Sequence, residues 1–267
     1  MTTIAAPLAY TLTDSATMLR RNLKHAMRYP VLTLMVAGIP VVLLLLFVFV
    51  FGGTLGAGLA EVSGGRSEYA DYLTPGILVL AVASAAQGTA ITVAMDMTEG
   101  IIARFRTMSI ARAAVLSGHV GGAVVQTAVG LVFVVGVALL VGFRPDANLL
   151  EWLAVAALLV LLSFALSWLS VAMGLAAKTV ESASNLPMPL ILLPFLGSGF
   201  VPAESMPAGL AWFAEHQPFT PIIETLRGLL TGAAIGSSGW LAVAWCAVIA
   251  FTGYLWARAR YERRPAH

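Results

Sequence analysis

Residues 31–51 read VLTLMVAGIPVVLLLLFVFVF and contain no charged side chain. The hydrocarbon core of a bilayer is about 30 Å thick, and roughly 20 apolar residues of α-helix cross it. The second half of the stretch, Val41–Phe51, has no polar face, so it does not suit a helix that lies at a water boundary. We therefore expect a membrane-spanning helix here.

The rest of the chain shares this apolar character. Of its 267 residues, 59% are hydrophobic and 10% are charged, and the mean hydropathy is +0.90. Soluble domains are about 25% charged, and disordered chains combine low hydrophobicity with high charge. Both classes are excluded. A net charge of only +2 also argues against nucleic-acid binding through overall basicity.

Five further apolar segments are candidates for membrane spans. The segment 186–201 should be short or kinked, because it carries three prolines and a Gly-Ser-Gly step. We predict an all-α membrane protein with six transmembrane helices. In chain order the spans are 31–51, 75–95, 115–143, 150–177, 186–201 and 240–256.

The basic residues predict the orientation. With six spans, 12 of the 15 Lys and Arg residues fall on the side that holds both termini, and only Arg66, Arg144 and Arg227 fall on the other. Because cytoplasmic loops are enriched in Lys and Arg, we expect both termini to be cytoplasmic.

The first 30 residues precede the first span and have a pattern of their own. Leu12, Ala16, Leu19, Leu23 and Met27 fall on one helical face, opposite Arg21, Lys24, His25 and Arg28. We expect 1–30 to form a cytoplasmic amphipathic elbow helix in the headgroup layer, with the transmembrane domain at 31–267. A simple topology anchor remains an alternative. A cleaved signal peptide fits poorly, since the apolar run exceeds the usual 7–15 residues.

Motifs for chemistry are missing from the sequence. It contains no G-x-x-x-x-G-K-[ST], G-x-S-x-G or H-E-x-x-H motif. Its single cysteine and its four histidines are scattered along the chain. We expect no enzymatic activity, no metal and no cofactor in this chain. The span cores carry no Asp, Glu, Lys or Arg, which disfavours an ion-coupled carrier, although Asp96, Glu99 or Glu181 is available for a charged rim. The energy source is more plausibly another protein.

The loop 96–114 joins the second and third spans on the predicted cytoplasmic side. Ile101, Ile102, Phe105 and Met108 follow the spacing of one apolar helix face. Such a helix fits a groove on a soluble partner, with Glu99, Arg104 and Arg106 fixing its register through ion pairs. The same pattern also suits a helix that only lies on the membrane surface, and the periodicity leaves both readings open.

Three motifs now stand in order along the chain. They are Tyr72-Leu73-Thr74-Pro75-Gly76-Ile77, then Glu99-Gly100-Ile101-Ile102 with Arg104-Phe105-Arg106, and then the block 185–202 followed by Gln217-Pro218-Phe219-Thr220-Pro221 with Glu224, Arg227 and Gly228. With them the chain resembles the type 2 ABC exporter permeases, and among these the daunorubicin-resistance-like drug efflux subunits. Ala103 and Ser109 depart from the family pattern, in which an acidic residue and a proline are frequent.

The resemblance implies a permease subunit in a bacterial plasma membrane, with no nucleotide site of its own. Two copies would form an outward path for a lipophilic or amphipathic solute such as a drug or antibiotic. Two ATPase subunits, which hold ATP and Mg, would dock on the coupling residues Glu99, Gly100, Ile101, Ile102, Arg104, Phe105 and Arg106. The rival interpretations are a membrane scaffold or sensor that recruits a soluble partner, and an ion-coupled carrier.

The segment 202–238 contains apolar pieces that are too short to span, so we expect re-entrant helices in the outer leaflet, as in that family. Glu224 and Arg227, at i and i+3, are candidates for an external gate or for an ordinary helical ion pair. Small residues spaced by four favour close helix packing, within one chain or between two. These pairs are Gly118 with Gly122, Ser163 with Ser167, and Ser170 with Gly174.

Overall fold

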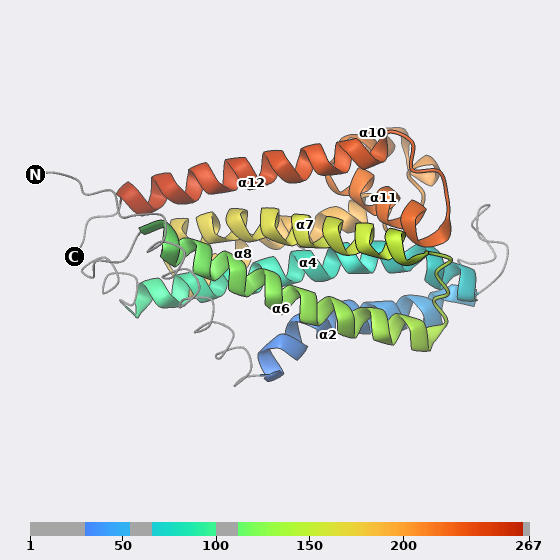
Figure 1. Cartoon of the computed structure of the whole chain (residues 1–267), viewed down its shortest axis with the longest axis horizontal. Coiled ribbons are helices and arrows are strands. Elements are labelled where there is room, and N and C mark those ends of the chain that lie inside the picture. Colours follow the sequence, from blue (N-terminus) through green and yellow to red (C-terminus); the bar gives the residue numbers. More distant parts are fainter. Residues whose placement is uncertain (1–29, 54–65, 100–111, 264–267) are drawn as a thin grey trace, which may run out of the picture.

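A computed structural model describes residues 30–53, 66–99 and 112–263. Within these ranges all regular structure is helical, and the long helices run side by side along the molecule (Figure 1). The expected all-α class is therefore confirmed for the part of the chain that the structure describes.

Four helices in the described ranges are long and apolar enough to cross a membrane: α4 (Arg66–Thr98), α6 (Arg112–Val141), α7 (Leu149–Ala176) and α12 (Ser238–Arg263). A shorter apolar helix, α2 (Pro30–Leu46), continues as the π-helix η1 (Phe47–Phe51). Pro30 is the first residue of α2, where proline is tolerated because no intrahelical N–H bond is lost. These elements correspond to five of the six predicted spans.

The fifth predicted span, 186–201, is divided into short pieces, as its prolines indicated. It follows α8 (Val180–Asn185) and comprises α9 (Met188–Leu192), the 3-10 turn η2 (Leu193–Leu196) and the non-helical residues 197–201. The chain then continues through η3 (Ala203–Ser205), α10 (Ala208–His216) and α11 (Phe219–Thr231) before it enters α12.

Helix α4 lies at the centre of the bundle. It packs against α2, α6, α7, α8 and α11, and its apolar part is mostly buried, whereas that of α12 is mostly exposed. The helix begins at Arg66, nine residues before the Pro75 at which the sequence placed the start of the span, because Tyr69 and Leu73 are fully buried and extend its packing. Pro75 is thus inside the helix.

The bundle has two distinct ends. At the loop end, α4 stops at Thr98, α6 starts at Arg112, and α7 and α12 finish; this is the left side of Figure 1. At the cap end, α11 packs against α4 and α12, and α10 lies next to α11. Large apolar side chains on α6, α7 and α12 point outward, among them Val132, Leu140, Leu150 and Phe251. A surface of this kind suits lipid rather than water.

Candidate functional site

A polar contact at the cap end joins three segments that are far apart in the sequence. The Nη2 atom of Arg227, on α11, donates to the carbonyl oxygen of Ser198 at 2.6 Å and to that of Tyr72 at 3.3 Å. The Tyr72 hydroxyl, on α4, donates to the same Ser198 oxygen at 3.1 Å. The guanidinium carbon lies 3.9 Å from the centroid of the Tyr72 ring, which is a cation–π distance. Arg227 therefore links α11 to α4 and to the segment 186–201, which we call the broken segment because it is divided into short pieces.

Two glycines bring the backbones together at this point. A Cβ atom on Gly76 would lie 2.6 Å from the carbonyl oxygen of Gly199, and one on Gly199 would lie 2.8 Å from the carbonyl oxygen of Pro194. Neither position has room for a side chain. We call Tyr72, Gly76, Ser198, Gly199 and Arg227 together the cap node.

Gln217 fixes the corner between α10 and α11. Its side chain is buried, and its amide nitrogen donates to the carbonyl oxygen of Leu193 at 3.1 Å and to the Thr220 hydroxyl at 3.3 Å. The Thr220 hydroxyl in turn donates to the carbonyl oxygen of Ala214 at 2.5 Å. A Cβ atom on Gly197 would collide with the Gln217 amide. The corner is thus held against η2 by hydrogen bonds and by close packing.

Glu224 and Arg227 contact different elements. The Glu224 carboxylate accepts a hydrogen bond of 3.0 Å from the hydroxyl of Ser238, the first residue of α12. Arg227 instead reaches α4 and the segment 197–201. The structure places both candidates at the cap end and gives them partners outside α11. Their role as a gate stays a prediction.

Of the predicted coupling residues, the structure describes Glu99, which lies at the loop end. Glu99 follows α4, and its N–H donates to the carbonyl oxygen of Met95 at 2.9 Å. The other candidates, Gly100, Ile101, Ile102, Arg104, Phe105 and Arg106, lie outside the described residues, as do residues 1–29 of the proposed elbow helix. The structure therefore does not test either helix.

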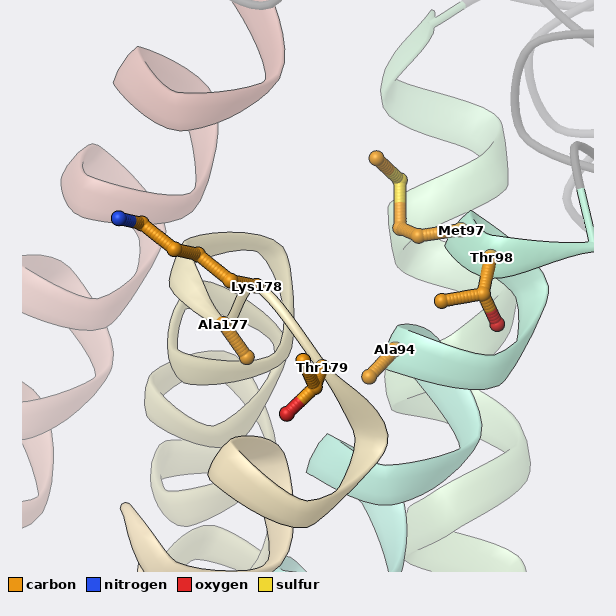
Figure 2. A pocket seen from close by; sticks show the side chains of 6 residues that line it. All are labelled: Ala94, Met97, Thr98, Ala177, Lys178 and Thr179. Atoms are coloured by element: carbon orange, nitrogen blue, oxygen red, sulfur yellow. The ribbon is translucent and has the colours of Figure 1, made fainter.

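A small pocket lies at the loop end, between the last turn of α4 and the turn that joins α7 to α8 (Figure 2). Its lining comes from Ala94, Met97 and Thr98 on one side and from Ala177, Lys178 and Thr179 on the other, and it encloses about 60 Å³. Sites for drug-sized ligands usually occupy about 300–1,000 Å³, so this pocket is too small for such a solute. Thr179 also caps α8, since its hydroxyl accepts from the Ser182 N–H at 3.2 Å.

The sequence model of the ABC-2 type transporters matches residues 14–231 of this chain. The matched range includes most of the bundle and every residue of the cap node. The chain belongs to the ABC-2 type transporter family.

Two relatives agree with this assignment. The ABC-2 chain is 29% identical to the daunorubicin resistance ABC transporter permease protein DrrB1 of Streptomyces coeruleorubidus over 208 residues. The aligned residues make up 77% of this chain and 71% of that protein. It is 23% identical to the probable doxorubicin resistance ABC transporter permease protein DrrC of Mycobacterium tuberculosis over 227 residues. The aligned residues make up 85% of this chain and 82% of that protein. The family predicted from the three motifs is confirmed.

Small residues bring helices of this ABC-2 chain close together. A Cβ atom on Gly174 would be 2.6 Å from the carbonyl oxygen of Ala90, so α7 touches α4 there. Its predicted mate Ser170 is fully buried. The remaining candidates, Gly118, Gly122, Ser163 and Ser167, are also buried. None of these observations concerns a second copy of the chain.

A further close contact, between α12 and α7, is not among the small-residue pairs predicted from the sequence. A Cβ atom on Gly253 would lie 2.6 Å from the backbone nitrogen of Leu169, so α12 meets α7 at that glycine. The signal was present, because Gly253 and Ala257 form another small pair spaced by four.

Proposed function

We propose that this chain is the permease subunit of an ATP-driven exporter that moves lipophilic or amphipathic solutes out of a bacterial cell. The observation that carries the proposal is the family match over residues 14–231, on an apolar helical chain whose sequence has no Walker A motif. Nucleotide hydrolysis then belongs to a separate ATPase subunit, which holds ATP and Mg, and the permease needs no cofactor of its own.

The solute class rests on the relatives and on the spans. Daunorubicin and doxorubicin, the drugs that appear in the names of the two relatives, are flat, amphipathic molecules. They suit spans whose cores carry no charged residues. Since the pocket in Figure 2 encloses only about 60 Å³, the path lies elsewhere, and we place it between two copies of the chain.

We propose six spans with both termini in the cytoplasm. Residues 31–51 and 186–201 would supply the first and fifth spans, next to the four longer helices. Helices α10 and α11, with 9 and 13 residues, are too short to cross and would enter the outer leaflet from the cap end. The 12 Lys and Arg residues that fall on one side of six spans in the sequence support a multi-pass plasma-membrane protein in this orientation.

The loop 96–114 would carry the coupling helix. Its apolar periodicity and its basic residues fit a groove on the ATPase. Nucleotide binding would close the two ATPase subunits, and their motion would pass through this helix and switch the packing of the spans. At the other end, Glu224 and Arg227 would hold the external closure through their contacts to α12 and α4.

The experiment is transport into inverted membrane vesicles that contain the full chain and an ABC ATPase encoded beside it. Daunorubicin is the probe, because its fluorescence reports accumulation. We expect uptake that requires ATP, continues after a protonophore is added, and stops when the Walker A lysine of the ATPase is substituted.

Two results would contradict the proposal. Uptake that collapses with the proton gradient and ignores the ATPase variant would indicate an ion-coupled carrier. An ATPase that binds the chain while no compound of a hydrophobic panel is transported would indicate a scaffold or sensor.

A further inference from the structure

A carboxylate and an imidazole meet at the loop end of the bundle. Asp96 lies in the last turn of α4, and His119 lies seven residues after the start of α6. The Nε2 atom of His119 is 3.3 Å from the Oδ2 atom of Asp96, and the two side chains are only 8% and 13% exposed. This contact therefore joins the two helices that lead into and out of the loop 96–114.

The helix turns that carry the pair also contribute apolar side chains to the core. Val93 on α4 and Leu116 and Val120 on α6 belong to one buried cluster, which is completed by side chains of α7 and α12. Next to such a cluster, an apolar pair of similar volume is usually as stabilising as a polar one, because burying polar groups is costly. An acid in the last turn of a helix is also opposed by the helix dipole. Neither stability nor helix preference favours this pair, and departures of this kind concentrate at functional sites.

The position of the pair suggests what it does. The chain leaves α4 after Thr98 and enters α6 at Arg112, so a force on the connection acts on both helices. The contact between Asp96 and His119 lies at the base of that connection. Without it, the ends of α4 and α6 would be held together less firmly, so less of a motion of the connection would reach α4, the helix that carries Tyr72 and Gly76 of the cap node.

We propose that Asp96 and His119 are positioning residues which make α4 and α6 respond as one unit to the ATPase. The inference rests on the proposed function, because it requires an ATPase that acts on the loop 96–114. Loss of the pair then uncouples hydrolysis from transport: the ATPase still docks and turns over, but less solute moves for each ATP.

The test uses the full complex in proteoliposomes, with ATP hydrolysis and daunorubicin transport measured on the same vesicles. For Asp96→Asn and for His119→Gln we expect the amount of solute moved per ATP to fall at least about fivefold, the lower range of a typical coupling between two sites. Co-purification of the ATPase should stay at the wild-type level. A merely structural role would lower the yield of the complex and both rates together, and would leave their ratio unchanged.

The chain offers a matched control at the same end. Arg258 and Glu262 form an exposed i, i+4 ion pair at 3.0 Å, with side chains 62% and 52% exposed. Their helix contributes Ala257 and Tyr261 to the cluster beside the acid–histidine pair. Because an exposed ion pair contributes little, Glu262→Gln should keep the wild-type ratio of solute to ATP.

A double variant that exchanges Asp96 and His119 tests whether the ratio of solute to ATP can be restored. The double variant Asp96→His with His119→Asp keeps the contact in reverse and places the acid away from the end of α4, so it should restore the ratio. The inference is overturned if the folded single variants keep the wild-type ratio or if the folded exchange variant does not recover it. Failure of the proposed function looks different, since the wild-type complex itself would then show no ATP-dependent transport.

Discussion

Arg227 and Tyr72 are 155 residues apart in the sequence, and the guanidinium carbon of one lies 3.9 Å from the ring centroid of the other. The same arginine donates to the carbonyl oxygen of Ser198. A planar cation that stacks on a ring and donates along its edge satisfies both demands, whereas an ammonium group does not. The contact adds a polar link between α11 and α4 to the packing of the buried apolar face of α11.

Arg227→Lys should therefore weaken the cap end although it preserves the charge. Desolvated cation–π contacts contribute about 2 kcal/mol, and we expect this variant to lose roughly 1–2 kcal/mol of stability and part of its transport rate. Thermal unfolding of the purified chain in detergent measures the first effect, and vesicle uptake measures the second.

Arg144 supplies the control for that substitution. It lies at the same end and is exposed, and its guanidinium group donates to the carbonyl oxygens of Leu139 and Phe143, close to it in the sequence. Arg144→Lys should unfold close to the wild-type temperature. Equal melting of the Arg227→Lys variant and the wild type would show that the stacking contributes nothing.

Two substitutions of Tyr72 distinguish the contribution of its ring from that of its hydroxyl group. In Tyr72→Phe the ring under Arg227 remains while the 3.1 Å bond to the Ser198 oxygen is lost. Because that oxygen still accepts from Arg227, we expect a loss of only about 1 kcal/mol. Tyr72→Leu removes both contacts and should cost clearly more in the same unfolding measurement. If the two variants unfold alike, the ring is not the important part of the side chain.

Gly76→Ala tests the backbone contact of the cap node. The new methyl group would lie 2.6 Å from the Gly199 oxygen, so α4 and the broken segment must separate, at a cost of about 1–3 kcal/mol for such overpacking. Gly136→Ala on α6 is the matched control, because its Cβ atom would meet nothing within 4 Å. That control should be neutral or slightly stabilising, since alanine favours helix by about 0.5–1 kcal/mol over glycine. Similar melting temperatures for the two alanine variants would refute the close contact.

These positions also show how far sequence reasoning reaches in this chain. The long helices follow from apolar runs, because the bilayer dictates their length, and the breaks near Pro187 and Pro194 follow from proline chemistry. The cap node does not follow, because hydropathy carries no information on which helices are neighbours. The i, i+3 spacing of Glu224 and Arg227 suggested a pair within α11, whereas the structure gives them partners on α12 and α4.

The loop 96–114 provides the last prediction. Arg104→Glu with Phe105→Ala reverses one charge and removes one large side chain from the apolar face of the expected coupling helix. If this face docks in a groove on the ATPase, both the ion pairing and the buried contact are lost. Co-purification of the ATPase with the chain should then fall sharply, while the amount of permease in the membrane fraction stays the same.

A variant at the opposite end of the molecule makes the comparison specific. Trp212, on α10, is 63% exposed and far from the loop end, so Trp212→Ala should leave ATPase binding intact. Because the bundle inserts through its own apolar helices, neither variant should change membrane insertion. Undiminished co-purification with the Arg104 and Phe105 substitutions would remove the coupling role from this loop and would favour a helix that only rests on the membrane surface.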